Sequence, residues 1–492
     1  MPAFRETRDP GSKIEPGSGS FRDDFQVREL PALIPPLARV TFASVADDAT
    51  TSGPGEAADP SAAPAVPPAA EPVRRRLALS TAIFALATGL SRVLGLVREM
   101  VASYYFGAKG PINAFTVAFQ IPNLVRALVA DAALSSAFVP VFSDLLEKGE
   151  RKRAWRVASS LFWLMLLGLG GLSALFMLIA PVLLRPFHPV DPGLAVGLSR
   201  VLFPIVALLG VSGIVVGILN SYEHFSVPAL TPVFWNLAII VGLAIGVPQE
   251  HTPSAKLYVY AASILVGTVI QVLLPIPWLR GRDDRLHFVI DWRDPAVART
   301  FKLMIPVTLG LGLINVNALI DTFFASRFID RSLAPTAIDK AFRVYMLPQG
   351  MFSVAVATVL FPSLSRLASR GDLDGFRHTV SLGLRQIAFL LVPASVISAV
   401  LAEPIVRLLY QRGQFDPHST HVVAGALAAF SFGLTFNGTM LMLNRAFFSL
   451  QSNWIPTIVA LGNLALNAIL DTAFYRFGTW GIPLATAVCN VA

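Results

Sequence analysis

Charged side chains occur inside long apolar segments of this 492-residue sequence, where they are costly and therefore informative. In LSRVLGLVREM, Arg92 and Arg98 are separated by about 9 Å of helical rise, and Glu99 follows directly. Arg126 and Arg343 lie inside two further apolar segments. Guanidinium groups in surplus over carboxylates favour a phosphate, because their planar forks bind pairs of oxygens and stay charged at physiological pH. We therefore expect these arginines to face a polar cavity.

Two simpler readings of these charges stay open. An ion pair between Arg92 and Glu99, seven residues apart, or an ion pair between two segments, would hold helices together without binding a ligand. Arg343 lies early in its segment and could reach the membrane interface by snorkelling, which fits Arg92 poorly. Ser91 and Arg98 lie along approximately one side of their helix. We favour the cavity, because charge inside a membrane is functional by default.

A second polar group occurs in the later half of the chain. Asp321 lies deep in NVNALIDTFFAS, and Asn467 and Asp471 are four residues apart in LGNLALNAILDTAF, which places them on one helix face. With Thr486 from the last segment, they offer hard oxygen ligands to a small cation. A hydrogen-bond network between helices and a proton-carrying acid are the alternatives.

The composition indicates the elements that carry these residues. The sequence is 54% hydrophobic and 14% charged, with a mean hydropathy of +0.62, so we expect an all-α polytopic membrane protein. Twelve apolar segments follow residue 76, most of them long enough to cross a core of about 30 Å as helices. They cover 78–105, 113–146, 154–183, 194–220, 227–247, 255–279, 299–328, 336–368, 376–402, 420–448, 453–475 and the stretch from about 480.

The segments divide into two six-helix halves. An Ala-Phe-x-Val opening, a proline and a proline-serine close recur in AFTVAFQIPNLVRALVADAALSSAFVPVFSD and AFRVYMLPQGMFSVAVATVLFPSLSR. This spacing places both copies in the same membrane direction, which indicates a parallel pseudo-two-fold repeat with a substrate path between the lobes. We expect the N-lobe, with a basic cytoplasmic loop, over 77–298 and the C-lobe over 299–492, where the last helix is truncated.

The chain ahead of these segments has a different composition. Residues 1–76 are rich in Pro, Ser, Ala, Gly and acidic residues without apolar periodicity, so we expect a disordered tail. Lys and Arg are about twice as frequent on the flanks that a cytoplasmic amino terminus places inside. The net charge of +8 therefore reflects membrane topology, and we expect no binding to nucleic acid.

Motifs for enzymatic chemistry are not found in the sequence. The single Cys489 excludes an intramolecular disulfide and disfavours a thiolate metal cluster. Neither a P-loop lysine, an HExxH motif nor a Ser-His-Asp spacing occurs. We expect a transporter and not an enzyme, with no organic cofactor.

LSRVLGLVRE, AFTVAFQIPNLVRALVADAALSSAFVP and LPQGMFSVAVATVLFPSLSRLA resemble the MurJ (MviN) lipid II flippases of the multidrug/oligosaccharidyl-lipid/polysaccharide (MOP) exporter superfamily. The resemblance runs from about Leu77 to Ala492. It implies a MATE-like fold in the bacterial inner membrane. It also implies translocation of undecaprenyl-pyrophosphate-linked peptidoglycan precursor to the outer leaflet by alternating access. Family members usually have helices 13 and 14, which this chain is expected to lack.

The resemblance also implies roles for the polar residues. The positions that match the family's substrate cavity are Arg92, Arg98, Arg126, Arg343, Ser91 and Glu99. Those that match its sodium site are Asp321, Asn467, Asp471 and Thr486, which makes Na⁺ a candidate coupling ion. The sequence departs from some members at Asn113, Ala127 and Met346. The implied partners are lipid II and membrane lipids, with cell-wall synthesis proteins as further candidates.

Three other functions compete with this one. A flippase for another polyprenyl-pyrophosphate glycan would need the same arginines, so only the motifs favour peptidoglycan. A drug/cation antiporter of the same superfamily would want an acidic or aromatic cavity. A scaffold that recruits wall-synthesis enzymes would need no transport at all.

Overall fold

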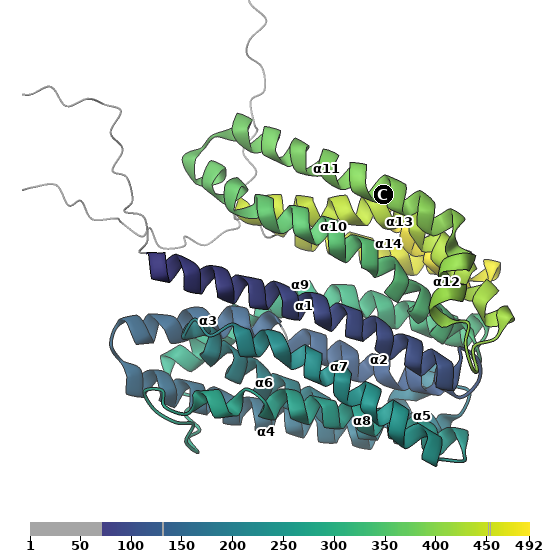
Figure 1. Ribbon diagram of the computed structural model, residues 1–492, viewed down its shortest axis with the longest axis horizontal. Coiled ribbons are helices and arrows are strands. Elements are labelled where there is room, and N and C mark those ends of the chain that lie inside the picture. Colours follow the sequence, from purple (N-terminus) through teal and green to yellow (C-terminus); the bar gives the residue numbers. More distant parts are fainter. Residues whose placement is uncertain (1–70, 130–131, 451, 453) are drawn as a thin grey trace, which may run out of the picture. The chain divides into compact units, whose positions relative to one another are not determined.

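The computed structural model describes residues 71–129, 132–450, 452 and 454–492 (Figure 1). Within these residues the chain forms helices and turns, without β-strands. The tail expected over 1–76 lies almost entirely outside the described residues. The first helix begins at Glu71, so Arg74, Arg75 and Arg76 lie in its first turns. The expected all-α architecture is confirmed.

The first half of the described chain folds into eight helices. They are α1 (Glu71–Phe106), α2 (Ile112–Val129), α3 (Ala132–Glu147), α4 (Arg151–Leu184), α5 (Pro192–Leu202), α6 (Pro204–Ser221), α7 (Ser226–Gly246) and α8 (Pro253–Leu273). The segment expected as one helix over 194–220 is interrupted at Phe203, because Pro204 lacks the backbone N–H that a continuous helix needs.

The second half folds into seven helices. They are α9 (Pro295–Phe324), α10 (Ala334–Arg370), α11 (Leu373–Val400), α12 (Ala402–Tyr410), α13 (Pro417–Ser449), α14 (Trp454–Phe474) and α15 (Gly481–Val491). Helix α12 was not predicted from the sequence, because it is too short for a membrane span. Its Val406 and Tyr410 are buried, while Glu403 and Arg407 pair on its exposed side at 2.7 Å.

Local sequence explains where several helices begin. Four of them start at a proline that follows a capping residue, and the cap's side-chain oxygen accepts a backbone N–H of the first turn. These pairs are Asp191–Pro192, Thr252–Pro253, Asp294–Pro295 and Asp416–Pro417. Proline suits the first helical position because the N–H that it lacks has no partner there.

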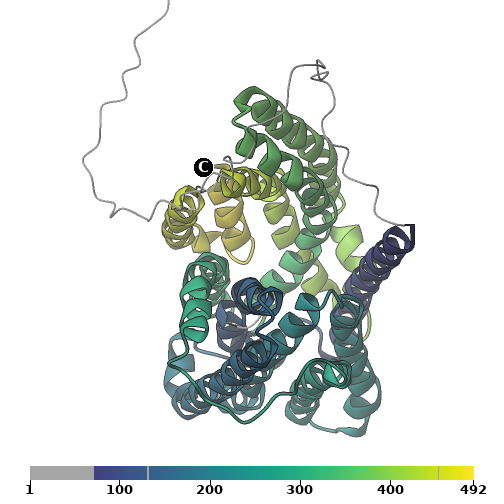
Figure 2. The same ribbon diagram turned by 90° about the vertical axis from the view of Figure 1, so that its left-hand side faces the viewer.

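The helices pack in two groups, visible as purple to teal and as green to yellow ribbons (Figures 1 and 2). In the first group α1 packs on α7, α7 on α8 and α4 on α6; in the second, α13 packs on α10, α11 and α15. The buried apolar residues follow this division, with two clusters within 102–297 and a third that, apart from Ala108, lies within 324–482. Helix α9 contacts α2, α3 and α14. The repeat and the lobe boundaries stay predictions.

Eight helical stretches among the described residues are long and apolar enough to cross a membrane. They comprise α4, α5 with α6, α7, α8, α10, α11, α13 and α14. Large apolar side chains point outward from them, such as Val359, Phe389 and Trp454. Such a surface is suited to lipid, and the chain is a multi-pass membrane protein.

Candidate functional site

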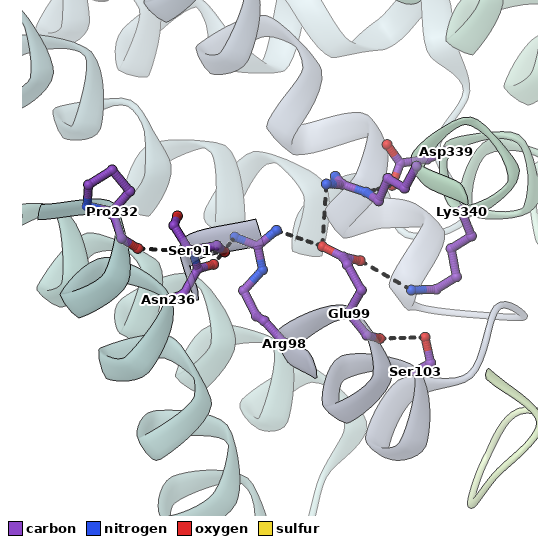
Figure 3. A network of polar contacts seen from close by, with 9 residues as sticks. Ser91, Arg98, Glu99, Ser103, Pro232, Asn236, Asp339 and Lys340 are labelled. Atoms are coloured by element: carbon purple, nitrogen blue, oxygen red, sulfur yellow. Dashed lines mark hydrogen bonds and ion pairs between the residues drawn. The ribbon is translucent and has the colours of Figure 1, made fainter. Parts of the chain in front are cut away.

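A buried ion cluster joins α1 to α10 around Glu99 (Figure 3). Arg98 Nη2 lies 2.7 Å and Arg343 Nη1 3.3 Å from Glu99 Oε1. Lys340 Nζ lies 3.5 Å from the other oxygen, Oε2. Lys340 and Arg343 are three residues apart and therefore share one face of α10. The structure thus brings three of the expected residues, Arg98, Glu99 and Arg343, into one site.

Helix α7 orients the guanidinium of Arg98. Its Nη1 donates to Asn236 Oδ1 at 3.1 Å, and its plane lies over the Trp235 ring at 4.7 Å. The Asn236 amide is held in turn, because its Nδ2 donates to the carbonyls of Ser91 (3.3 Å) and Pro232 (2.9 Å). Arg98 Nε is buried without a hydrogen-bond partner among the described residues. Buried polar atoms are normally paired, so this unsatisfied donor is a reason to expect a ligand.

The cluster has an excess of positive charge. Arg343 Nε also donates to Asp339 Oδ2 at 2.8 Å, one turn earlier on α10. Three cations, Arg98, Lys340 and Arg343, thus face two carboxylates, Glu99 and Asp339, which leaves one positive charge. An anion is the ligand that such a cluster attracts.

The other two expected arginines lie apart from these contacts. Arg92 is exposed, and its guanidinium lies against Gly350 of α10. A β-carbon at position 350 would be only 2.8 Å from Arg92 Nη1. Arg126 donates to Asn123 Oδ1 from Nε (3.2 Å) and Nη2 (2.9 Å) within α2. The ion pairs described for Glu99 involve neither arginine, so the alternative of an Arg92–Glu99 pair is not seen. The other form of that alternative, an ion pair between segments, does occur, because Glu99 of α1 pairs with Lys340 and Arg343 of α10.

Three residues of the site, Lys340, Asp339 and Asn236, were not predicted from the sequence. A signal for the first two was available, since Lys340 precedes Arg343 by three residues and Asp339 by four, which are spacings of neighbours on a helix. Asn236 could not be found in this way, because it reaches Arg98 across 138 positions of sequence.

The acidic group of the second half also assembles. Asp321 of α9 is nearly buried, and Asn467 and Asp471 of α14 are fully buried. Asn467 Nδ2 donates to Asp321 Oδ1 at 3.0 Å and to Asp471 Oδ2 at 3.2 Å. Thr486 does not join them through any contact described, since its hydroxyl donates to the Ile482 carbonyl of its own helix at 3.3 Å.

Two oxygens of this acidic group, Asn467 Oδ1 and Asp471 Oδ1, are buried without a hydrogen-bond partner in the described part of the chain. Buried polar atoms are normally paired, so two orphaned oxygens are a reason to expect a ligand. Clusters of three or more His, Cys, Asp or Glu, which would suit a transition metal, do not occur among the described residues. The donors fit a small hard cation instead.

The turns at one end of the helices are tied together by hydrogen bonds. Asn113, at the start of α2, donates from Nδ2 to the carbonyls of Ala108 and Ser332, and its Oδ1 accepts the Thr336 N–H at 2.9 Å. The Gln414 N–H also donates to the Tyr104 carbonyl at 2.9 Å. These bonds hold together the chain segments that follow α1, α9 and α12.

The fold is shared with transporters of the MOP superfamily. The structure matches a solved inward-facing multidrug resistance MATE family transporter of that superfamily with a TM-score of 0.71 over 81% of this chain and 91% of the other, at 14% identity. It matches a solved lipid II flippase MurJ in an inward closed conformation with a TM-score of 0.72 over 83% and 85%, at 26% identity.

Sequence comparison narrows the class to one family. The family model described as lipid II flippase MurJ matches residues 102–492, so the chain belongs to this family. It is 31% identical to a probable lipid II flippase MurJ of Vibrio cholerae over 85% of this chain and 81% of that protein. It is also 31% identical to the lipid II flippase MurJ of Burkholderia cenocepacia, over 82% and 79%.

Proposed function

We propose that this protein moves lipid II, the polyprenyl-pyrophosphate-linked peptidoglycan precursor, from the cytoplasmic to the outer leaflet of the bacterial inner membrane by alternating access. The observation that carries the proposal is the buried, net positive cluster of Arg98, Lys340 and Arg343 around Glu99. Its charge accounts for a pyrophosphate, and membership of the family accounts for the peptidoglycan cargo. The amino terminus then lies in the cytoplasm, as the positive-inside rule predicts.

The geometry suggests how the headgroup is held. Arg98 and Arg343 both bind Glu99 Oε1, so a phosphate that approaches them competes with that oxygen. Arg98 Nε and the remaining guanidinium nitrogen of Arg343, Nη2, can donate to the phosphate. Bidentate contacts between arginine and phosphate are strong. Arg98 belongs to α1 and Arg343 to α10. An anion shared between them therefore stabilises the arrangement in which these helices are close, which is the differential binding that a conformational change requires.

Arg92 and Arg126 would contact the substrate at another stage. Arg92 is exposed beside α10, where it can attract an entering anion before the buried cluster does. Arg126 would have to exchange its bonds with Asn123. The hydrogen-bonded turns around Asn113 would open on the outer side to release the headgroup.

Asp321, Asn467 and Asp471 would hold a coupling cation, for which we propose Na⁺. The cation would supply positive charge to two close carboxylates that otherwise share one amide. Thr486 would join only after leaving the Ile482 carbonyl. Because α9 carries Asp321 and packs on α2, α3 and α14, occupancy of the site can bias both groups of helices. A membrane potential of 100 mV contributes about 2.3 kcal/mol per charge moved.

No covalent bond changes in this cycle, so we propose a transporter without enzymatic activity; lipid II and membrane lipids are its partners, with cell-wall synthesis proteins as further candidates. A drug/cation antiporter is disfavoured by the positive excess of the cluster, which repels cationic substrates. A flippase for another polyprenyl-pyrophosphate glycan would use the same contacts and differs only in cargo.

The test is Arg98→Ala in a depletion–rescue strain that depends on this protein, with outer-leaflet lipid II as the readout. We expect loss of translocation at normal expression. Arg377→Ala is the matched control, because Arg377 is 79% exposed in its side chain and pairs only loosely with Asp374, at 3.7 Å. Unchanged translocation in the Arg98 variant would contradict a transport role for the cluster. If the protein moved only a different polyprenyl glycan, the assignment of lipid II as its substrate would be wrong.

A further inference from the structure

Lys340 is the least expected member of the ion cluster. Its side chain is only 6% exposed, compared with 35% for Arg343 on the same face of α10. Lysines are almost never this buried unless they are paired. Its ammonium lies 3.5 Å from Glu99 Oε2 and 5.1 Å from the Tyr410 ring of α12. The structure therefore holds a lysine against one particular oxygen of Glu99.

The two oxygens of Glu99 have different partners. Both arginines bind Oε1, whereas Lys340 binds Oε2. Each arginine also has a second partner, since Arg98 donates to Asn236 and Arg343 to Asp339. If both arginines turned toward another anion, they would remain partly satisfied. Among the ion pairs described, Glu99 would keep only Lys340.

The consequence for an anionic substrate follows from electrostatics. A phosphate bound by Arg98 and Arg343 must displace Glu99 Oε1, which leaves a buried carboxylate a few ångströms from the new anion. An unpaired buried carboxylate is strongly unfavourable, and two close anions repel each other. Both penalties decrease if a cation remains paired with the carboxylate and keeps it away from the bound phosphate.

We propose that Lys340 is a positioning residue that retains Glu99 through Oε2 when the substrate takes the two arginines. This inference rests on the proposed function and assigns to Lys340 a role distinct from direct phosphate binding. Tyr410 supports it by covering the ammonium with its ring face, which keeps the ion pair out of water. Lys340 thus allows Arg98 and Arg343 to alternate between two anions, the Glu99 carboxylate and the phosphate of the substrate.

The test is a double-mutant cycle on lipid II binding by the purified full-length protein in nanodiscs. Lys340→Gln is measured alone and in the Glu99→Gln background, with Lys148→Gln as a control because Lys148 is exposed and pairs with Asp144 on the surface. We expect Lys340→Gln to weaken binding about 10- to 100-fold when Glu99 is present, which is the effect of unit charges about 6–12 Å apart at an effective dielectric constant near 20. In the Glu99→Gln background the same change should weaken binding less than about threefold.

The outcomes separate this inference from the proposed function. Equal weakening in both backgrounds would mean that the lysine acts on the substrate directly, which overturns the inference. Loss of binding in Arg98→Ala with full binding in Lys340→Gln also overturns it, while the proposed function survives. Full binding in Arg98→Ala contradicts the proposed function itself. If Lys340→Gln alone does not fold, lipid II binding is compared between Glu99→Gln and the double variant. A loss of affinity above about tenfold in the double variant would reject the inference.

Discussion

Arg98→Lys tests whether the site needs the guanidinium fork or only a positive charge. The substitution keeps the charge but removes the geometry that serves Glu99 and Asn236 together, at 2.7 and 3.1 Å, and the stacking on Trp235 at 4.7 Å. A hydrogen bond to a charged group contributes about 1.5–3 kcal/mol. A partly desolvated cation–π contact adds about 0.5–2 kcal/mol. Together these predict a loss of about 2–5 kcal/mol, or roughly 30- to 5,000-fold in affinity for the headgroup.

The assay is lipid II binding by the purified protein, with outer-leaflet lipid II in the rescue strain as a second readout. Arg407→Lys is the matched control, because Arg407 makes a 2.7 Å ion pair with Glu403 on the exposed side of α12. Its binding should stay within about threefold of the unmodified protein, since exposed pairs contribute little. Binding by Arg98→Lys within that same range would refute the fork argument and leave Arg98 as a simple point charge.

Two further predictions concern the cation site and a helix start. Asp471→Asn removes one of the two carboxylates and should weaken Na⁺ stimulation of transport about tenfold or more. The control is Asp374→Asn, which changes an exposed side chain and should leave the stimulation unchanged. Sodium dependence that persists unchanged in Asp471→Asn rejects the site. The Ser419 hydrogen bonds hold the pKa of Asp416 below its ordinary value, so this cap stabilises α13 above the unfolded pKa and loses its effect as the pH falls through the folded pKa. Asp416→Ala should therefore lower the free energy of unfolding by about 1 kcal/mol near pH 7, with a deficit that shrinks below about pH 4 in thermal unfolding; a deficit independent of pH would contradict the capping role.

The positive charge excess that the sequence predicts has a different composition in the structure. Sequence reasoning attributed it to four arginines, whereas the described cluster contains two arginines and a lysine around Glu99. Arg92 and Arg126 make contacts elsewhere, with Gly350 and Asn123 as neighbours. An anion that meets Arg92 first and the Glu99 cluster later would move along the face of α1.

Helix positions were predictable because their signals are local. An apolar run of sufficient length and an Asp-Pro or Thr-Pro start define a helix without reference to distant residues, and most expected spans agree with the helices to within a few residues. Two spans differ more, because α1 begins at Glu71 and the span expected over 113–146 is described as α2 and α3. The break at Phe203 and the helix α12 escaped prediction. Hydropathy reports the length of an apolar run, while the break depends on Pro204 and α12 depends on packing of Val406 and Tyr410.

The sequence by itself determined that charged groups lie where a membrane makes them costly, and this singled out Arg98, Glu99, Arg343, Asp321 and Asp471. That inference needs only the residue type and the apolar neighbours, which are local properties. Tertiary structure decided which groups meet. The contacts of Glu99 with Lys340, of Arg98 with Asn236 and of Asp321 with Asn467 join positions 138 to 241 residues apart, and helix packing alone sets such distances.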